Sequence, residues 1–435
     1  MTAPASAFAS TVPAGAARSA GSAGWITSLR TALSEELPAA VALRRALHAE
    51  PELGGHEQRT AARVAAALGQ PGAADVSGGR LIQIGDGDAP VIAIRAELDA
   101  LPIVEDTGVP WAARNGAAHA CGHDVHLAAL TALARALHRF PGPLPLLAVL
   151  QPREETYPCG AKDLVGSAAL ARHDVLAVIG VHLQPRLARG VVTAGAGPVN
   201  AAADEFRITV HGRGGHAAYP QSARDPIVAA AHVIVALQHL ISRRTDPLHA
   251  AVLTVGALHA GEAANVIPAT AAMTGTLRTF EHADRQQLQA AIEATARATA
   301  AAYECTAEVT FTEGEPVLRN NARLAAATEP ELRAAGLHLA EPLRSCGADD
   351  FSYFCSRYPS LMMFVGVGPG SADAPGLHHP SFLPPDDAVA DVAASMLAGY
   401  LGACALHTPV GTNPPPDGLD GAPATLITAA GDHHD

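Results

Sequence analysis

Four short apolar segments constrain the fold of this chain more than any other feature. They are rich in Val, Ile and Leu and end near Pro or Gly: VIAIRAE (91–97), LPLLAVLQP (144–152), DVLAVIGVHLQP (174–185) and SLMMFVGVG (360–368). Continuous apolar runs of this length are typical of strands that are buried on both faces. Helical patterns such as HEQRTAARVAAALG (56–69) lie between them. The sequence therefore predicts an α/β domain with a mainly parallel sheet.

The middle of the chain has a different pattern. Its predicted elements are, in order, a strand, a helix, two strands, a helix and a strand: 205–212, 225–241, 250–260, 269–280, 284–304 and 305–314. This β-α-β-β-α-β order is typical of a ferredoxin-like domain. The α/β pattern returns after Pro316, and a closing helix is predicted near 387–404. We therefore expect a compact second domain inserted into the first.

The two ends of the chain are rich in Ala, Ser, Gly and Pro, which favours disorder. The first 24 residues lack the basic start and continuous apolar core of a signal peptide, so we expect a cytoplasmic protein. The predicted organisation is a disordered extension, a first catalytic part, a lid and dimerisation domain, a second catalytic part and a disordered tail: 1–24, 25–199, 200–314, 315–407 and 408–435.

Composition and motifs exclude several classes of protein. The formal net charge is −13 and no basic run is present, which disfavours a nucleic-acid partner. No uninterrupted apolar run is long enough to predict a membrane span. The chain has neither a G-x-S-x-G elbow nor a Walker loop, which disfavours a serine hydrolase or a P-loop enzyme. Its six cysteines are scattered through a long chain, so a disulfide framework is not expected.

The segment HACGHDVH (119–126) has three His, one Cys and one Asp in eight positions. It could hold a metal, form a disulfide or cap a helix, and a single His at a helix start is more often a cap or a surface residue. Four other polar clusters lie at the ends of predicted strands or in loops: RAELDALP (95–102), QPREE (151–155), GVHLQP (180–185) and GLHHPSF (376–382). Ligands bind where strands of α/β sheets end, so all five segments are candidates for one site.

The candidate donors in these segments are one thiol, one carboxylate and three imidazoles: Cys121, His123, Glu155, His182 and His378. This mixture suits Zn²⁺, Mn²⁺, Co²⁺ or Ni²⁺ better than Ca²⁺ or Mg²⁺. Five ligands are too many for one tetrahedral site that keeps a position open for water. They suit two adjacent ions that share a ligand and a bridging water.

Together the motifs resemble one family. They are similar to the aminoacylase and carboxypeptidase-type metallopeptidases, peptidase family M20, in the branch with hippurate hydrolases and auxin-conjugate hydrolases. The matching segments extend from HAEPELGGHEQRT (48–60) to LHHPSFLPPDD (377–387) and include GRGGHAAYP (212–220), NVIP (265–268), GTLRTF (275–280) and GADDFSYF (347–354). The resemblance covers nearly the whole chain except its two ends.

The resemblance implies a usually dimeric hydrolase. Its larger, mixed-sheet domain would hold two divalent ions, and its inserted domain would act as lid and dimer interface. Carried over to this sequence, the resemblance implies the same five metal ligands, Cys121, His123, Glu155, His182 and His378. The ligand is placed at His378 because relatives often have Ser or Asn where His379 stands.

The resemblance also implies roles beyond the ligands. Glu154 matches the catalytic carboxylate. The inserted domain would contribute three residues that approach the substrate, His216, Asn265 and Arg278, with His216 acting in the site of the other subunit of a homodimer. Three residues of the HACGHDVH segment would orient the ligands through hydrogen bonds: His119, Asp124 and His126.

We therefore expect metal-dependent hydrolysis of the amide bond of an N-acyl amino acid or a related conjugate, with Glu154 as general base on a metal-bound water. The alternatives are a dipeptidase or carboxypeptidase-like enzyme, whose free substrate amine would need an acidic partner, and a relative that binds metal without catalysis. Two departures from the family pattern bear on the pocket. Glu97 stands where relatives usually have Asp, and TYPC (156–159) stands where they often have glycines.

Overall fold

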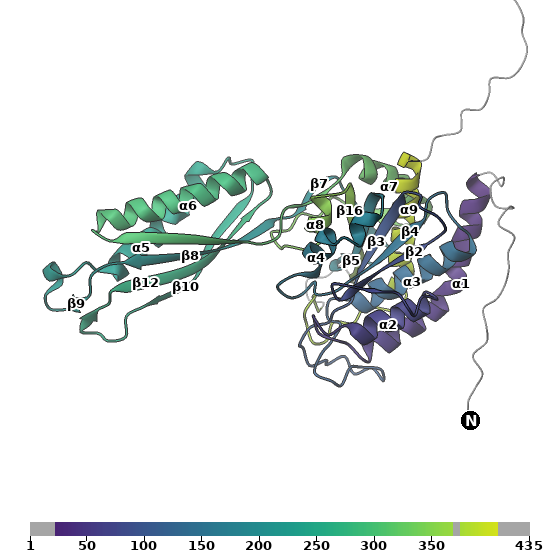
Figure 1. Ribbon diagram of the computed structural model, residues 1–435, viewed down its shortest axis with the longest axis horizontal. Helices are drawn as coiled ribbons and strands as arrows, with labels where there is room; N and C mark the ends of the chain where they lie inside the picture. The colour runs from purple at the N-terminus through teal and green to yellow at the C-terminus, as the bar shows by residue number, and fades with distance from the viewer. Residues whose placement is uncertain (1–21, 369–374, 408–435) are drawn as a thin grey trace, which may run out of the picture.

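The computed structural model describes residues 22–368 and 375–407, which form two lobes joined by a narrow connection (Figure 1). Most of the predicted extension (1–24) and all of the predicted tail (408–435) lie outside the described residues. Helix α1 (Ser22–His48) begins inside the predicted extension, so the expectation of disorder is wrong for residues 22–24. Tertiary contacts hold this first turn, since the indole of Trp25 donates a hydrogen bond to the carbonyl of Pro141 at 3.1 Å.

The larger lobe is built on an eight-stranded mixed sheet in the order β1-β2-β4-β3-β5-β16-β6-β15. Its four central strands are mutually parallel and coincide with the four predicted apolar strands: β4 (Leu146–Gln151), β3 (Val91–Glu97), β5 (Val175–Ala188) and β16 (Ser360–Gly368). The outer strands are shorter: β1 (Asp75–Val76), β2 (Gly79–Ile84), β6 (Val191–Thr193) and β15 (His338–Leu339). The predicted α/β fold with a mixed sheet is confirmed.

Successive side chains of the central strands point to opposite faces, and each face is covered by helices. On one face, Ile92 and Ile94 pack in a core with α1, α2 (Gln58–Ala67), α3 (His123–Arg139), α7 (Ala322–Ala334) and α9 (Ala388–His407). On the other face, Val91 and Ala93 pack against the short helices α4 (Gly160–Gly166) and α8 (Ser352–Cys355). The central strands are therefore buried on both sides, as their composition predicts.

Among the described residues, two helical segments reach the length and mean hydropathy of a membrane span, although neither is an uninterrupted apolar run in the sequence. They are Pro226–Arg244 and Ala388–His407. The apolar window of the second is 72 % buried, because α9 packs against the sheet of the larger lobe. The first packs one face against the sheet of the smaller lobe. Both helices therefore have a place in a folded core, which accounts for their apolar composition.

The smaller lobe has the predicted order of elements: β8 (Ala202–His211), α5 (Pro226–His239), β10 (Ala251–Ala260), β12 (Thr270–Thr279), α6 (His282–Ala302) and β13 (Thr306–Glu313). The strands form an antiparallel sheet in the order β10-β12-β8-β13, and both helices pack on it. A short pair, β9 (Gly215–His216) with β11 (Val266–Ile267), lies near the end that is remote from the larger lobe (Figure 1). Where the lobes join, β7 (Gly197–Asn200) pairs with β14 (Leu318–Asn320).

A buried ion pair holds the base of the smaller lobe together. Asp204, near the start of β8, is 2 % exposed and accepts a hydrogen bond from Nε of Arg285 at 2.8 Å. The side-chain amide of Gln289 donates to the same carboxylate at 2.9 Å. Both donors come from α6, so one carboxylate fixes the position of this helix on the sheet.

We predict that Asp204→Ala destabilises the smaller lobe by about 3–5 kcal/mol, because Arg285 is left buried without its partner. Urea unfolding followed by circular dichroism measures the effect. Glu205→Ala, at an exposed position of the same strand, is the control and is expected to change stability by no more than about 0.5 kcal/mol. Equal losses in the two variants would contradict this role of Asp204.

Candidate active site

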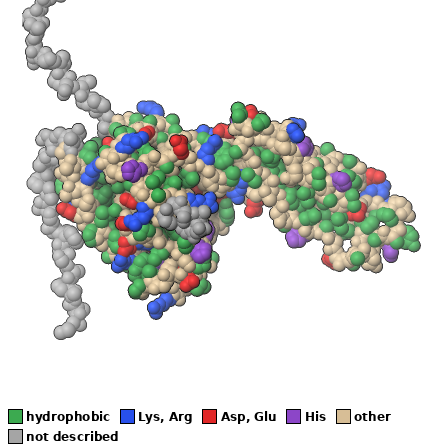
Figure 2. Space-filling model, turned by 180° about the vertical axis from the view of Figure 1, so that it is seen from behind, with side chains coloured by type: hydrophobic (Ala, Val, Ile, Leu, Met, Phe, Trp, Pro, Cys, Tyr) green, Lys and Arg blue, Asp and Glu red, His purple; other side chains and the backbone are tan. Residues whose placement is uncertain are grey.

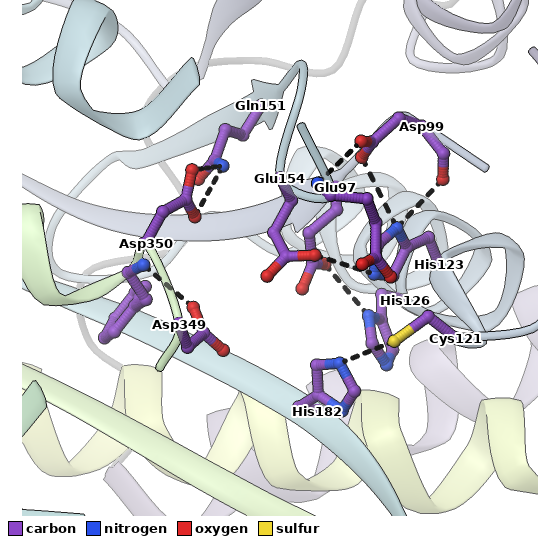
Figure 3. Close-up of polar contacts among 12 residues, drawn as sticks. Glu97, Asp99, Cys121, His123, His126, Gln151, Glu154, His182, Asp349 and Asp350 are labelled. Carbon is purple, nitrogen blue, oxygen red and sulfur yellow. Dashed lines mark hydrogen bonds and ion pairs between the residues drawn. The ribbon is translucent and has the colours of Figure 1, made fainter. Parts of the chain in front are cut away.

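The predicted polar clusters meet at one edge of the larger sheet. Parallel strands end at the same edge, so the segments that follow β3 and β4 bring Asp99 and Glu154 together, with His182 on β5 beside them (Figure 3). Cys121 and His123 come from the start of α3. The site is therefore assembled from segments that are far apart in the sequence.

The five candidate donors form two groups that share one residue. The ligating atoms of Cys121, His123 and His182 lie within 4.8 Å of one another, and so do those of Cys121, Glu155 and His378. His378 reaches the site because its amide donates to the carbonyl of Ala120 at 2.8 Å. Its Nε2 lies 3.0 Å from Oε1 of Glu155. These five residues could hold two neighbouring cations.

The two buried histidines present the nitrogen that a metal requires. Nδ1 of His123 lies 2.9 Å from the carbonyl of Asp99, and Nδ1 of His182 lies 2.8 Å from the carbonyl of Leu183. A carbonyl accepts only a proton donor, so each Nδ1 carries the proton and each Nε2 has a free lone pair. Nε2 of His182 lies 3.4 Å from Sγ of Cys121. Nε2 of His123 is buried and has no hydrogen-bond partner among the described residues, as expected for an atom that faces a cation.

Burial and neighbouring charges set the protonation of these donors. Burial lowers the pKa of His182 to about 4, so its imidazole is neutral near pH 7. Burial raises the pKa of the Cys121 thiol well above its usual value, so a bound cation is needed to hold it as thiolate. Burial alone would raise the pKa of Glu155, but a hydrogen bond from His378 and the nearby His123 lower it to about 2.

Glu154 differs from its neighbour Glu155. Its side chain is 12 % exposed, and its Oε2 lies 3.8 Å from Nε2 of His123, which is beyond hydrogen-bond distance. Burial raises the pKa of Glu154 well above its usual value, and the carboxylates of Asp349 and Glu155 raise it further. A carboxylate with a raised pKa is a stronger base than an ordinary one, and no tight hydrogen bond occupies this side chain, so Glu154 is suited to carry a proton.

Behind these residues lies a buried network centred on Arg95. Its guanidinium is fully buried and forms ion pairs with Glu97 and, at 2.8 Å, with Asp350. Its Nε donates to the side-chain oxygen of Gln151 at 2.8 Å. The second carboxylate oxygen of Glu97 lies 2.9 Å from Nδ1 of His126. The network therefore ties the ends of β3 and β4 to the segment before α8.

Comparison with known proteins matches this chain to a family. The model of peptidase family M20/M25/M40 matches residues 93–402, which is most of the chain. The N-acetyl-L-cysteine deacetylase of Bacillus subtilis is 37 % identical over 352 residues, covering 79 % of this chain and 82 % of that protein. The chain belongs to peptidase family M20/M25/M40. It is a metal-dependent hydrolase of amide bonds.

Other members have the same fold and related names. The N-acetyldiaminopimelate deacetylase of B. subtilis is 33 % identical over 373 residues and covers 83 % of this chain and 97 % of that protein. A crystal structure from B. subtilis, described as a dinuclear metal-binding peptidase of family M20, matches with a TM-score of 0.74 and 30 % identity over 86 % of this chain and 99 % of that one. A structure from Staphylococcus aureus, described as a putative aminohydrolase, gives a TM-score of 0.79.

In this family member, the HACGHDVH segment supports the site in a different way from the one that the sequence predicts. His126 does orient its surroundings, because its Nε2 accepts a hydrogen bond from the amide of Leu183, next to His182. Asp124 instead binds Arg44 at 3.2 Å and His48 at 3.0 Å, and neither is one of the five candidate donors. Asp124 therefore anchors α3 to α1, and the prediction that it orients a ligand is wrong.

His119 also departs from the prediction. It is 1 % exposed, and neither ring nitrogen has a hydrogen-bond partner among the described residues, so no hydrogen bond from it orients a ligand. Burial lowers its pKa to about 4, which keeps the ring neutral. Its nearest aromatic neighbour among the described rings is His48, with ring centroids 6.3 Å apart.

The sequence reasoning missed several residues that the structure places at the site. Asp99 has the orienting role, because its backbone carbonyl fixes His123 and its carboxylate accepts from the amide of Glu155 at 2.9 Å. Its position at the end of a predicted buried strand, in RAELDALP, was the available signal. Three further residues converge here: Gln151, Asp349 and Asp350. In the sequence, only their positions at a strand end or in a loop pointed to them.

The residues predicted in the inserted lobe lie in two places. His216, on β9, pairs with Val266, and the carbonyl of Asn265 accepts from the amide of Ala217 at 3.0 Å. This pair of strands lies at the remote end of the smaller lobe (Figure 1). Arg278 instead lies opposite Ala203 on β8, where the lobes join. Within one chain, the structure brings neither His216 nor Asn265 to the five donors.

The TYPC segment lies between the site and the smaller lobe. The hydroxyl of Tyr157 donates to the buried carboxylate of Glu315, which follows β13, while 74 % of the Tyr157 residue surface is exposed. The Oγ1 atom of Thr156 lies only 2.6 Å from where a Cβ on Gly54 would stand. The TYPC segment therefore fills space beside Glu154 and Glu155. It also connects the site to the junction of the lobes.

We predict that Arg95→Met destabilises the larger lobe by about 3–5 kcal/mol at neutral pH, because it leaves buried carboxylates without their cation. In the wild type, Arg95 helps to hold the pKa of Glu97 well below its usual value against the effect of burial, so ionised Glu97 stabilises the fold. In the variant the buried carboxyls prefer their neutral forms. The difference in unfolding free energy between the wild type and Arg95→Met is therefore expected to become smaller as the pH falls.

Urea unfolding at several pH values measures this difference. The control is Arg63→Met, because Arg63 forms an exposed pair with Glu50 at 2.8 Å and its loss is expected to cost no more than about 1 kcal/mol. A difference that stays constant or widens on acidification would show that Arg95 does not act through these carboxylates.

Proposed function

We propose that this protein hydrolyses the amide bond of N-acyl amino acids or related conjugates with two divalent ions, chosen from Zn²⁺, Mn²⁺, Co²⁺ and Ni²⁺. The proposed ligands are the five donors of the site: Cys121, His123, Glu155, His182 and His378. The observation that carries this proposal is their convergence into two groups that share Cys121, next to Glu154. The mixture of thiol, imidazole and carboxylate donors fits these metals.

When bound, the ions supply a water of lowered pKa and polarise the scissile carbonyl. Glu154 is the proposed proton carrier. It accepts a proton from the attacking water and passes it to the leaving nitrogen, for which its raised pKa suits it. The carbonyl of Asp99 holds the imidazole of His123 in place, and His126 accepts from the backbone amide of Leu183, next to His182. The names of the two B. subtilis deacetylases support an N-acylated amino acid as substrate.

We also propose that two copies of the chain pair through the smaller lobe. Apolar side chains are exposed on α5, where Val228 is 43 % and Val235 70 % exposed, and β10 is an edge strand of the lobe's sheet. Figure 2 shows apolar side chains spread over the visible face of this lobe. A homodimer would cover such a surface. It would also allow His216, remote from the site of its own chain, to reach the site of the other copy and stabilise the developing oxyanion.

The location that we propose is the cytoplasm. Cys121, Cys159, Cys305, Cys346 and Cys355 are free thiols, and Cys346 is exposed. Free thiols are expected in a reducing compartment.

The test of the function is amine release from a panel of N-acyl amino acids by metal-loaded protein. Glu154→Gln is expected to keep about two metal equivalents and to lose about 10²-fold or more in kcat, because the proton carrier is gone. Glu155→Gln is expected to lose metal, because a ligand is altered. Metal content is measured by mass spectrometry after dialysis. Full wild-type activity after exhaustive chelation, or equal metal content in the two variants, would contradict the proposal.

The role of His216 is tested by complementation. Homodimers of Glu154→Ala and of His216→Ala are each expected to be nearly inactive. When the two proteins are dissociated, mixed and reassociated, heterodimers have one site with both wild-type residues, so activity is expected to return to roughly a quarter of the wild-type level per chain for random pairing. No recovery, although heterodimers are shown to form, would place His216 outside the other subunit's site.

A further inference from the structure

Asp349 lies in the site, but the chemistry proposed above gives it no role. It lies in the segment before α8, and Figure 3 shows its carboxylate on the side of the open space opposite Cys121 and His123, facing Glu154 and His182. A carboxylate oxygen of Asp349 lies within 4.8 Å of one of Glu154. Two carboxylates at this separation repel each other unless a positive charge lies between them.

The orientation of Asp349 is fixed by its surroundings. Its Oδ1 accepts a hydrogen bond from the amide of Phe351 at 2.8 Å and lies 3.5 Å from Nη2 of Arg95. The side chain is 10 % exposed. Its Oδ2 has no hydrogen bond among the described residues. One oxygen is therefore held by the protein, and the other is available to a ligand in the site.

The neighbouring Asp350 is different, because both of its oxygens are occupied. Oδ1 accepts from Arg95 and Gln151, and Oδ2 accepts from Gln151 and from the amide of Ala161. Only Glu154 and Asp349 in this acidic group have oxygens free for a ligand. Two donors are too few for a tight third metal site, but they suit a small cation that donates hydrogen bonds.

An ammonium group fits between the two carboxylates. Its hydrogen bonds to carboxylate oxygens are about 2.8 Å long and diverge at roughly the tetrahedral angle, so the two oxygens that it bridges lie about 4.6 Å apart. This separation is compatible with the arrangement of Glu154 and Asp349. The proposed reaction forms an amine at this position, because Glu154 must lie within hydrogen-bond distance of the leaving nitrogen to pass it a proton.

We propose that Asp349 is a catalytic residue that binds the leaving amine and stabilises it as ammonium between its own carboxylate and that of Glu154. This inference rests on the proposed amide hydrolysis.

The reaction balances without a further reactant. The water oxygen bonds to the carbonyl carbon, and one water proton moves to Glu154. The carbon–nitrogen bond then breaks, and its electron pair stays on nitrogen. That nitrogen receives the proton from Glu154 and a second proton from the remaining hydroxyl of the former water, so the products are a carboxylate and an ammonium. Asp349 accepts hydrogen bonds and takes no proton.

In this role, Asp349 assists the cleavage of an amide bond but not that of an ester bond. An ester of the same shape releases an alcohol, which does not become a cation. Asp349→Asn removes the negative charge with little change in size. It is therefore expected to lower kcat for an amide much more than for the matching ester.

The experiment compares N-acetyl-L-alanine with O-acetyl-L-lactate on metal-loaded enzyme. Asp349→Asn is expected to lower kcat for the amide about tenfold to hundredfold, the usual loss for a hydrogen bond to a charged group, and to change kcat for the ester by less than about threefold. Asp349→Glu keeps the charge and is expected to retain most of the amide activity. Asp88→Asn, the same change in an exposed loop of the larger lobe, is expected to alter neither rate.

A binding measurement keeps the test independent of turnover. By calorimetry, wild-type enzyme is expected to bind L-alanine more tightly than L-lactate by about tenfold, and Asp349→Asn is expected to remove most of this preference. Equal loss of amide and ester activity, loss of metal, or an unchanged preference for L-alanine would overturn the role of Asp349. If wild type binds L-alanine selectively but cleaves no N-acyl amino acid, the proposed function fails and the ammonium site stands.

Discussion

The guanidinium of Arg95 is the interaction on which the geometry of the site depends. It is buried in the sheet and bonds to residues from three separate segments: Glu97, Gln151 and Asp350. A buried cation requires this full set of partners, because each unpaired charge in a low-dielectric interior is strongly destabilising. From Glu97 the network continues through His126 to the amide next to His182, and from Gln151 it continues along the chain into the turn that carries Glu154. The positions of the proposed base and of one imidazole therefore follow from one buried charge.

The fold could be predicted from the sequence because its strongest signals are local. Runs such as VIAIRAE match a strand that is buried on both faces, and the structure has β3 at the same residues. The order of elements in the smaller lobe was predictable for the same reason. The five donors were also recognisable, because Cys and His in a polar cluster near a strand end are unusual and the chemistry of a metal requires them. The structure brings all five together.

The side chains that support the site could not be predicted, because they pair with residues that are far away in the sequence. Arg95 and Asp350 are 255 positions apart, so neither segment indicates that the two side chains meet. Asp124 lies within a segment rich in metal-binding residues, yet its partners Arg44 and His48 come from α1, a helix for which no role was predicted. His119 shows the same limit, because composition alone cannot distinguish an imidazole that bonds to a ligand from one that is merely enclosed. Supporting side chains are specified by tertiary contacts, whereas candidate metal ligands can be recognised by their chemical type.

The connection between the lobes is compatible with an origin of the smaller lobe as an insertion into the chain of the larger one. The amide of Ala203 donates to the carbonyl of Glu315 at 3.0 Å, and the amide of Gly314 donates back to Ala203 at 3.0 Å, so the chain leaves the larger lobe and returns to it through adjacent, hydrogen-bonded strands. A gene segment placed at a single point of an ancestral one-lobed hydrolase would produce this connectivity without disturbing the order of the large sheet. Because these two strands lie side by side, a tight turn between them could replace the smaller lobe and leave the larger lobe as one continuous chain.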